Sequence, residues 1–324
     1  MADLSSQEGR AQGDPPRLTL AICTYNRADE LRKTLQGLER LTAPCAWEVI
    51  IVDNGSTDRT LRTARDFAST TTNLRVRIEC EPRRGVSFAR NRALEAARSG
   101  IVVFVDDDMD CDPCLLEAHA RAFEDPSVVA TGGRVIPCWP SSVDASMPPW
   151  LRDAFHNEIG GPTGRYDFGD AVREITRTSG IAFPFTGNMG LRREAALEVG
   201  GFRTDLGWSP EGRRIGGEDT DLMKRMSKAY GRILYLPGAV VRHRLSAAHL
   251  TEQYYREWHI AYGRASVLMR GRRGALGTLL KIIEQVFRIV RYSLPPIAFL
   301  YPKAVRLRKR YQAIGRILQL LGLQ

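Results

Sequence analysis

The chain has 324 residues, which is enough for one large domain with an appendage or for two domains. Its composition, with 43% hydrophobic and 26% charged residues, is typical of a globular protein and excludes a collagenous, disordered or disulfide-stapled chain. The net charge of +10 comes from the end of the chain, because residues 256–324 contain 14 Lys and Arg against two Glu. This basic tail predicts attraction to a polyanion, either a nucleic acid or an anionic membrane surface.

Residues 1–16 are polar and contain Gly and Pro, which predicts a disordered lead-in. Short β-branched runs then alternate with amphipathic segments, and this alternation predicts repeated βα units in a largely parallel sheet with helices on both faces. The predicted strands are 18–23, 47–52, 74–79 and 101–105, and the predicted helices are 30–41, 59–68, 87–97 and 115–123. From 131 to 182 the pattern gives way to Pro, Gly, Trp and charge, which predicts a long irregular insertion before order returns at 185–202, 218–230 and 232–243.

Polar residues follow three of the predicted strands, at 24–27, 53–58 and 106–108. Sheets of this kind bind ligands beyond the carboxyl ends of their strands, so these residues are candidates for a binding site. The third group is three consecutive aspartates, whose mutual repulsion raises their pKa values unless a cation or hydrogen-bond donors stabilise the ionised form. Hard divalent cations prefer such ligands, which predicts a metal site; the alternative is a solvated acidic turn. Neither GxGxxG after the first strand nor GxxxxGK[ST] is present, so a nicotinamide or phosphate-loop site is not expected.

Four segments at these strand ends resemble the successive signatures of glycosyltransferase family 2. They are residues 18–27, 49–58, 85–92 and 104–108, and the later segments 187–193, 200–202 and 217–221 continue the resemblance. The resemblance implies an α/β fold of the GT-A type, with a Rossmann-like, mainly parallel central sheet flanked by helices. The catalytic domain would span 17–245, with a nucleotide-binding half at 17–130 and an acceptor-binding half at 131–245. Residues 246–324 would form a basic amphipathic helical tail as a C-terminal extension.

The resemblance also implies a nucleotide-sugar donor, with UDP as the commonest nucleotide of the family, held over the sheet with the help of Mn²⁺ or Mg²⁺. Asp108 would bind the metal, with Asp107 as the alternative ligand, and His243 would be either a further ligand or a hydrogen-bonded structural residue. Asn188 and Glu218 would lie on the acceptor side. The residues implied for donor binding are Thr24, Tyr25, Arg27, Asp53, Arg83, Arg90, Asp106 and Asp107.

Asp219 matches the acidic residue that acts as catalytic base in the family. A sugar hydroxyl is a poor nucleophile, and a positioned carboxylate withdraws its proton as the bond to the anomeric carbon forms. A single in-line displacement by that hydroxyl would invert the anomeric configuration. The alternative role of Asp219 is a charge at a helix N-terminus, for which Glu218 and Asp221 are equally eligible.

Two apolar stripes run along the basic tail at helical spacing. Basic amphipathic helices of this kind lie on anionic membranes, which predicts a peripheral protein on the inner face of the cell membrane. The alternative is packing against the catalytic domain or a second subunit, which would make an oligomer. The first stripe is Leu279, Ile282, Ile283, Val286, Phe287 and Val290, and the second is Leu307, Tyr311, Ile314, Leu318 and Leu321.

The cysteines and the absence of a long apolar segment bear on location. Six cysteines without an apolar leader indicate a cytoplasmic protein with structural thiols, although Cys111 and Cys114 have the spacing of a redox or half-zinc motif. The longest charge-free tail segment, 292–302, is far shorter than the roughly 20 apolar residues of a membrane-spanning helix.

Two other functions fit parts of the pattern. Nucleotidyl transfer on a related sheet would need a Gly-rich basic loop after the first strand, where this chain has residues 24–27 instead. A nucleic-acid-binding protein would use the basic tail. However, the sequence contains no zinc, helix-turn-helix or RNP signature, and this function would not explain the three aspartates. We therefore expect a sugar donor, a glycan or glycolipid acceptor and an anionic membrane as partners, and no nucleic acid.

Overall fold

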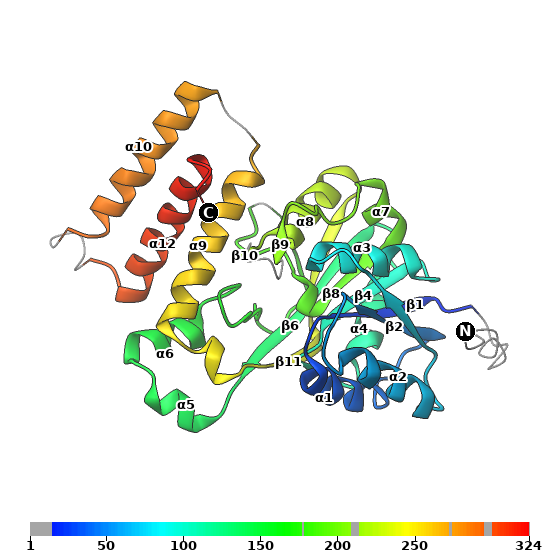
Figure 1. The fold of residues 1–324 in the computed structure, drawn as a ribbon. Helices are drawn as coiled ribbons and strands as arrows, with labels where there is room; N and C mark the ends of the chain where they lie inside the picture. Colours follow the sequence, from blue (N-terminus) through cyan, green and yellow to red (C-terminus); the bar gives the residue numbers. More distant parts are fainter. Residues whose placement is uncertain (1–14, 177, 209–213, 272–273, 295–299, 324) are drawn as a thin grey trace.

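The computed structural model describes residues 15–176, 178–208, 214–271, 274–294 and 300–323. The predicted lead-in therefore lies almost wholly outside the described residues. One large sheet with helices around it forms an α/β domain, and long helices extend from its C-terminal side (Figure 1).

The first half of the sheet follows the predicted βα alternation. Its strands pair in parallel in the order β3-β2-β1-β4. The apolar runs of β1, β2 and β4 are buried, with Leu20, Ile50 and Val103 all 0% exposed, whereas the edge strand β3 is only half-buried. Burial on both faces requires the continuous apolar runs seen in the sequence. The strands are β1 (Leu18–Thr24), β2 (Trp47–Asp53), β3 (Val76–Cys80) and β4 (Ile101–Asp106), and the helices between them are α1 (Ala28–Leu38), α2 (Thr60–Thr70) and α3 (Val86–Ala96).

The second half of the sheet is mixed, so the prediction of a mainly parallel sheet is wrong there. Strands β6 (Val128–Cys138) and β11 (Arg232–Arg244) are parallel to each other, but β8 (Met189–Arg192) lies between β4 and β6 and is antiparallel to both. The chain enters β8 from the carboxyl end of β4 through the short 3-10 helix η1 (Thr186–Asn188), and it must then run back along its neighbours. Strands β5 (Met109–Cys111) and β7 (Arg173–Glu174) add antiparallel pairs to β11.

Part of the region predicted to be irregular is strand β6. Two glycines hide its apolar pattern, and each is required by a close neighbour. A side chain at Gly132 would overlap Pro184, and one at Gly133 would overlap Asn188. The rest of the region contains the short helices α5 (Ser141–Ser146) and α6 (Pro149–Asn157).

Shorter elements complete the α/β domain. They are α4 (Leu115–Ala122), α7 (Arg193–Glu198), β9 (Gly207–Trp208), β10 (Arg214–Ile215), α8 (Glu218–Ala229) and η2 (Ala247–His249). All six cysteines are free, and burial raises the pKa of the Cys111 thiol to about 12. A buried thiol with so high a pKa is unreactive, which supports a structural role for Cys111.

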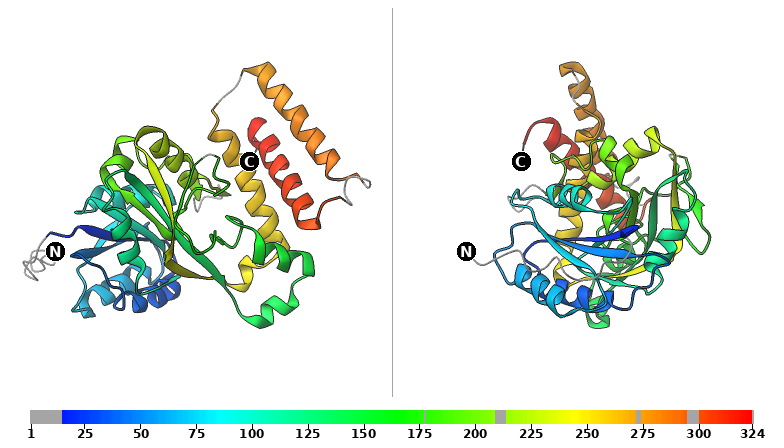
Figure 2. Two further views of the ribbon diagram at one scale, coloured as in Figure 1. Left: turned by 180° about the vertical axis from the view of Figure 1, so that it is seen from behind. Right: turned by 90° about the vertical axis from the view of Figure 1, so that its right-hand side faces the viewer.

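The tail forms the helices α9 (Glu252–Leu268), α10 (Ala275–Arg291) and α12 (Lys303–Leu320). Figure 2 shows α10 farthest from the sheet, with α12 between it and α9. Tyr255 of α9 meets Trp150 of α6 with ring centroids 5.7 Å apart, and Leu307 and Tyr311 of α12 pack on the same apolar cluster. For these two residues of the second stripe, packing against the catalytic domain is therefore the correct alternative.

Helices α9 and α12 cross at close range because glycines face each other's backbone. A side chain at Gly263 would overlap the carbonyl of Gln312, and one at Gly315 would overlap the carbonyl of Ile260. Replacing Gly315 with Ala should therefore force the helices apart. Overpacking of this kind costs about 1–3 kcal/mol.

We expect Gly315→Ala to lower the urea midpoint of unfolding accordingly. Gly274→Ala is the matched control, because nothing lies within 4 Å of a side chain added there. Equal midpoints for the two variants and the unaltered protein would contradict the close crossing.

Candidate active site

The registers of the first four strands bring the polar strand ends together. In the parallel ladder Thr24 lies opposite Asp53 on one side of β1, and Cys23 lies opposite Asp106 on the other. The residues that follow these strands must therefore share the carboxyl edge of the sheet, where α/β proteins bind ligands. The predicted convergence of residues 24–27, 53–58 and 106–108 is present.

Asp107 lies inside the edge rather than facing out. Its Oδ2 accepts a hydrogen bond of 2.7 Å from Thr24 Oγ1, and its Oδ1 lies 3.3 Å from Arg27 Nε. Burial raises the pKa of Asp107 to about 7, against the opposing effect of Arg27. Both oxygens are occupied, so Asp107 joins the end of β1 to the end of β4.

Asp108 pairs with two cationic groups and keeps one oxygen free. Its Oδ2 lies 2.7 Å from a terminal nitrogen of Arg27 and 3.4 Å from His243 Nε2, while its buried Oδ1 has no partner among the described residues. Burial acts to raise the pKa of Asp108, but His243 and Arg27 outweigh it and hold that pKa below its usual range. Asp108 is therefore an ionised carboxylate with an unused acceptor.

His243 reaches Asp108 because β5 pairs with β11, which places His243 opposite Met109. Its Nδ1–H donates to the carbonyl of Thr163 at 2.8 Å, and this bond directs Nε2 toward Asp108. Burial acts to lower the pKa of His243, but the Asp108 carboxylate outweighs it and raises that pKa.

A second group of carboxylates surrounds the buried guanidinium of Arg90. One terminal nitrogen of Arg90 lies 2.6 Å from Glu218 Oε1 and 3.4 Å from Asp219 Oδ1, and the other lies 3.7 Å from Asp106 Oδ1. Arg90 thus links the end of β4 to the N-terminus of α8, which begins at Glu218. This places Arg90 on carboxylates, whereas the sequence suggested a contact with the donor diphosphate.

The Asp219 side chain is more exposed than that of Glu218. The Asp219 side chain is 15% exposed and that of Glu218 is 6% exposed. Burial raises the pKa of Asp219 to about 8, with Arg90 opposing it and Glu218 adding to it. Of the two, Asp219 is the better placed to exchange a proton with a ligand near neutral pH.

The arginine that faces the site from the loop before α3 is Arg84, not Arg83. Arg83 is held by both oxygens of Glu81, at 2.8 Å each, and its side chain is 62% exposed. Arg84 donates to the hydroxyl of Tyr25 and lies 5.1 Å from the centre of its ring. The sequence analysis selected Arg83 and not Arg84, and the one signal against Arg83 was Glu81, the acid two residues before it.

Asn188 is buried, and its amide is fully engaged within the fold. Its Nδ2 donates to the carbonyls of Arg134, at 3.1 Å, and Ala239, at 2.9 Å, while its Oδ1 accepts from His119 Nε2 at 2.9 Å. Although η1 packs against β4, the amide of Asn188 has no group left to offer a ligand. Its assignment to acceptor binding gains no support from this position.

Two asparagines that sequence reasoning did not select hold the site loops. Asn26 has a positive φ of 50°, and its Oδ1 accepts from the backbone N–H of Thr57 at 2.7 Å. Asn54 donates to the carbonyl of Arg83 at 2.7 Å and accepts from the N–H of Gly85 at 2.9 Å. Their signal in the sequence was their place in the loops after β1 and β2, where asparagine tolerates such conformations.

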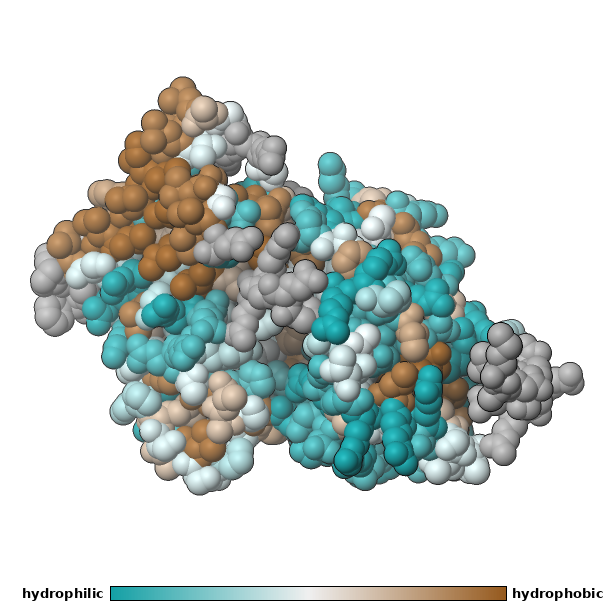
Figure 3. Space-filling model, in the orientation of Figure 1, coloured by the Kyte–Doolittle hydropathy of each residue, from teal (hydrophilic) through white to brown (hydrophobic). Residues whose placement is uncertain are grey.

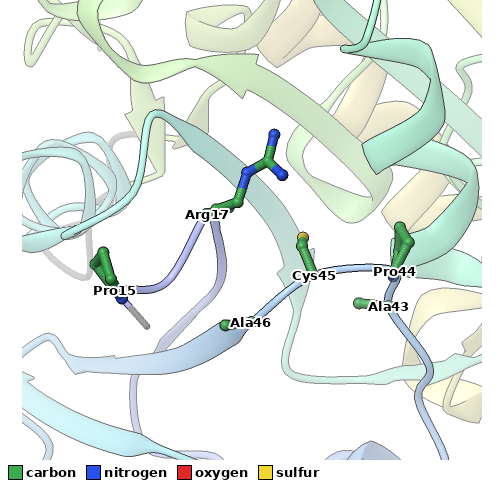
Figure 4. Close-up of a pocket in the computed structure, with 6 residues that line it drawn as sticks. All are labelled: Pro15, Arg17, Ala43, Pro44, Cys45 and Ala46. Atoms are coloured by element: carbon green, nitrogen blue, oxygen red, sulfur yellow. The ribbon is translucent and has the colours of Figure 1, made fainter. Parts of the chain in front are cut away.

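A pocket at the other edge of the sheet is a poor candidate. It is lined by Pro15 and Arg17 before β1 and by residues 43–46 before β2 (Figure 4). These residues precede the strands, so the pocket lies away from the carboxylates, and Arg17 is the charged residue in its lining.

The carboxyl edge of the sheet offers part of the ligand set of a cation, and a bound substrate could supply the remaining ligands. Within the part of the chain that the structure describes, no three His, Cys, Asp or Glu side chains converge closely enough to hold a metal by themselves. Asp108 and His243 could supply two ligands, and Asp108 Oδ1 is unpartnered. Mg²⁺ typically takes one or two carboxylates and completes its shell with substrate phosphates and water, so these residues fit such an ion.

Comparison with known proteins agrees with this architecture. Solved structures similar to this chain include mannosyltransferase PcManGT from Pyrobaculum calidifontis, with a TM-score of 0.62 and 20% identity over 96% of this chain and 89% of that one. TarS of S. aureus is similar with a TM-score of 0.53 and 18% identity, over 86% of this chain and 44% of that one. These likenesses confirm the predicted GT-A fold.

The sequence relatives point to the same family. A glucosyl-dolichyl phosphate glucuronosyltransferase of Haloferax volcanii is 26% identical over 71% of this chain and 69% of its own length. Glycosyltransferase AglE of the same organism is 26% identical over 79% of this chain and 76% of its length. The model of "Glycosyl transferase family 2" matches residues 19–200, more than half of the chain. The chain therefore belongs to glycosyl transferase family 2 and is a glycosyltransferase.

Proposed function

We propose that this enzyme transfers a sugar from a nucleoside-diphosphate donor to a hydroxyl of a glycolipid or cell-envelope polysaccharide, with inversion at the anomeric carbon. The observation that carries the proposal is the single edge at which Arg90 joins Asp106 of β4 to Asp219 of α8. A donor held by the first and an acceptor activated by the second would meet there. The dolichyl phosphate in the name of one relative supports a glycolipid acceptor.

The donor would lie across the ends of β2, β1 and β4. Asp53 is 3% exposed, and its Oδ1 has no hydrogen-bond partner in the part of the chain that the structure describes, so it can accept from a base N–H or a ribose hydroxyl. The Asp106 side chain is 39% exposed and is free to accept from the ribose. Solved neighbours contain GDP-Man or UDP, so both nucleotides are candidates, with UDP as our first choice.

Asp108 and His243 would hold Mn²⁺ or Mg²⁺. Two solved neighbours contain Mn²⁺. We favour Asp108 over Asp107 as the metal ligand. Both oxygens of Asp107 contact Thr24 or Arg27, whereas Asp108 Oδ1 has no partner among the described residues. When bound, the ion would neutralise the charge that develops on the departing diphosphate. Because the Asp108 carboxylate raises the pKa of His243, the imidazole would have to lose a proton to become a ligand.

Asp219 would be the general base. Its carboxylate takes the proton from the acceptor hydroxyl as that oxygen attacks the anomeric carbon from the face opposite the leaving diphosphate. Arg90 contacts Asp219 and Glu218 and keeps their charges from repelling each other. One displacement without a covalent sugar intermediate gives inversion. We place the enzyme in the cytoplasm, at the inner face of the membrane that carries its acceptor.

Substitution of the two key aspartates tests these roles. Asp219→Asn should lower kcat by about 10²–10⁴, the usual contribution of a general base, while KM for the donor changes little.

Asp108→Asn should abolish the dependence of the rate on Mn²⁺ and raise KM for the donor.

The matched control is Asp66→Asn on α2, whose side chain is 69% exposed and distant in the fold from the carboxyl edge. Transfer at the unaltered rate by Asp219→Asn would remove Asp219 from the mechanism. Unaltered Mn²⁺ dependence in Asp108→Asn would remove Asp108 from the metal site.

The pH dependence follows from Asp219. A pKa raised to about 8 leaves this carboxyl largely protonated at pH 6, and only the deprotonated form accepts a proton. Hence kcat/KM, measured at saturating Mn²⁺, should rise up to about tenfold per pH unit below pH 8 and level off above it. The residual rate of Asp219→Asn should not show this rise. A profile that is flat from pH 6 to 9, or that falls, would contradict the assignment.

A further inference from the structure

Helix α10 turns its large apolar side chains outward. Leu276 is 70% exposed, Leu280 58% and Phe287 66%. These residues recur at helical spacing and form one stripe along the helix. In Figure 3 apolar side chains gather over this part of the molecule, whereas the face of the α/β domain in that view is largely hydrophilic. The exposed residues of the stripe are Leu276, Leu279, Leu280, Ile283, Val286, Phe287, Val290 and Leu294.

The side of α10 that faces the protein is more polar. Its buried residue is Gln285, which is 1% exposed and accepts a hydrogen bond of 3.2 Å from Arg316 of α12. Lys281 is 20% exposed and pairs with Glu284 at 2.5 Å. A helix that packs on a protein core buries its apolar side and exposes its polar side. Helix α10 instead exposes its apolar side and buries Gln285. Its outer face would therefore be stabilised by contact with an apolar environment.

Cationic side chains gather where α10 meets α12. Arg316 reaches Gln285 of α10, and Arg288 of α10, which also pairs with Glu284 at 3.0 Å, lies near Lys309. Burial and the neighbouring Arg308, Arg288 and Arg316 lower the pKa of Lys309. Burial and the neighbouring Arg288 and Arg270 lower the pKa of Arg316. These cations repel one another, and an anionic surface would stabilise them, at about 1 kcal/mol for each Lys or Arg near a membrane.

We propose that the outer face of α10 docks this enzyme onto an anionic lipid bilayer. Leu280, Ile283 and Phe287 would enter the boundary of the acyl chains, and Arg288 and Lys309 would meet the head groups. Among the described residues, no helix is long and apolar enough to cross a bilayer, which fits a helix lying in the plane of the surface. A second copy of the chain fits less well, because a two-fold contact through α10 would bring the cations of the two copies together.

The docking helix is connected to the proposed base through packed helices. Helix α10 packs on α12 and α12 on α9, and α9 packs on β10, which ends shortly before α8 begins. There Ala265 lies against Gly217, the residue before Glu218, in a cluster with Leu206 and Ile215. If the proposed function holds, docking through α10 would present Asp219 to acceptors anchored in the same bilayer.

The test is retention of the full chain on vesicles. Unaltered protein should sediment with vesicles containing phosphatidylglycerol and not with vesicles of phosphatidylcholine alone. The double variant Leu280→Gln, Phe287→Gln removes apolar surface from exposed helical positions without changing the charge, and should bind the anionic vesicles at least about tenfold more weakly. Val172→Gln is the matched control, because Val172 is 61% exposed on the α/β domain.

Each outcome bears on the docking face independently of catalysis. Weaker retention of the double variant, with the control and the thermal midpoint unchanged, supports the proposal whether or not Asp219 is the base. Equal retention of both variants, or no retention of the unaltered protein, overturns it. A dimer that the same double substitution dissociates, without vesicle binding, would assign the stripe to a second copy and would also overturn it.

Discussion

The site depends on keeping five carboxyl groups together in a largely buried place. Asp106 ends β4, Asp107 and Asp108 follow it, and Glu218 and Asp219 begin α8, so strand register and helix packing bring these negative charges to one edge. Arg27 serves two of these groups and Arg90 serves the other three. Burial raises the pKa values of Asp107 and Asp219, and Arg27 and Arg90 oppose this rise only in part. An edge that lacks positive charge in this way is suited to a ligand that brings its own cation.

The same shortage gives the carboxyls different roles. Both carboxylate oxygens of Asp107 have partners, in Thr24 and Arg27. The adjacent Asp108 has one carboxylate oxygen without a partner among the described residues. Glu218 takes the short contact with Arg90, and Asp219 is left with a pKa near neutrality. Environment, rather than residue type, separates a structural acid such as Asp107 from the proposed metal ligand Asp108 and the proposed base Asp219.

What could be predicted from the sequence was the part governed by local periodicity. The βα alternation and the polar strand ends located the edge, because parallel strands bring their carboxyl ends to one side. What could not be predicted depended on distant partners. Arg90 bonds Glu218, which lies 128 residues later in the sequence. His119 bonds the side chain of Asn188, which lies 69 residues later. Strand β6 was missed because Gly132 and Gly133, needed for close packing, interrupt its apolar pattern. The helical spacing of the apolar residues of α10 could be seen in the sequence, but only the structure shows that Gln285 is the buried residue of this helix and that the apolar stripe faces outward.

The most direct test of the account is whether a divalent ion and a nucleoside diphosphate bind together at this edge. Ligands that bind only the folded protein stabilise it by an amount that grows with the logarithm of their concentration relative to Kd, and so raise its thermal midpoint. With UDP or GDP, Mn²⁺ should raise the midpoint more than the sum of the two separate effects, and Asp108→Asn should lose this excess. Equal stabilisation by nucleotide in Mn²⁺ and in EDTA, or an excess that persists in Asp108→Asn, would contradict a metal-assisted donor site at the end of β4.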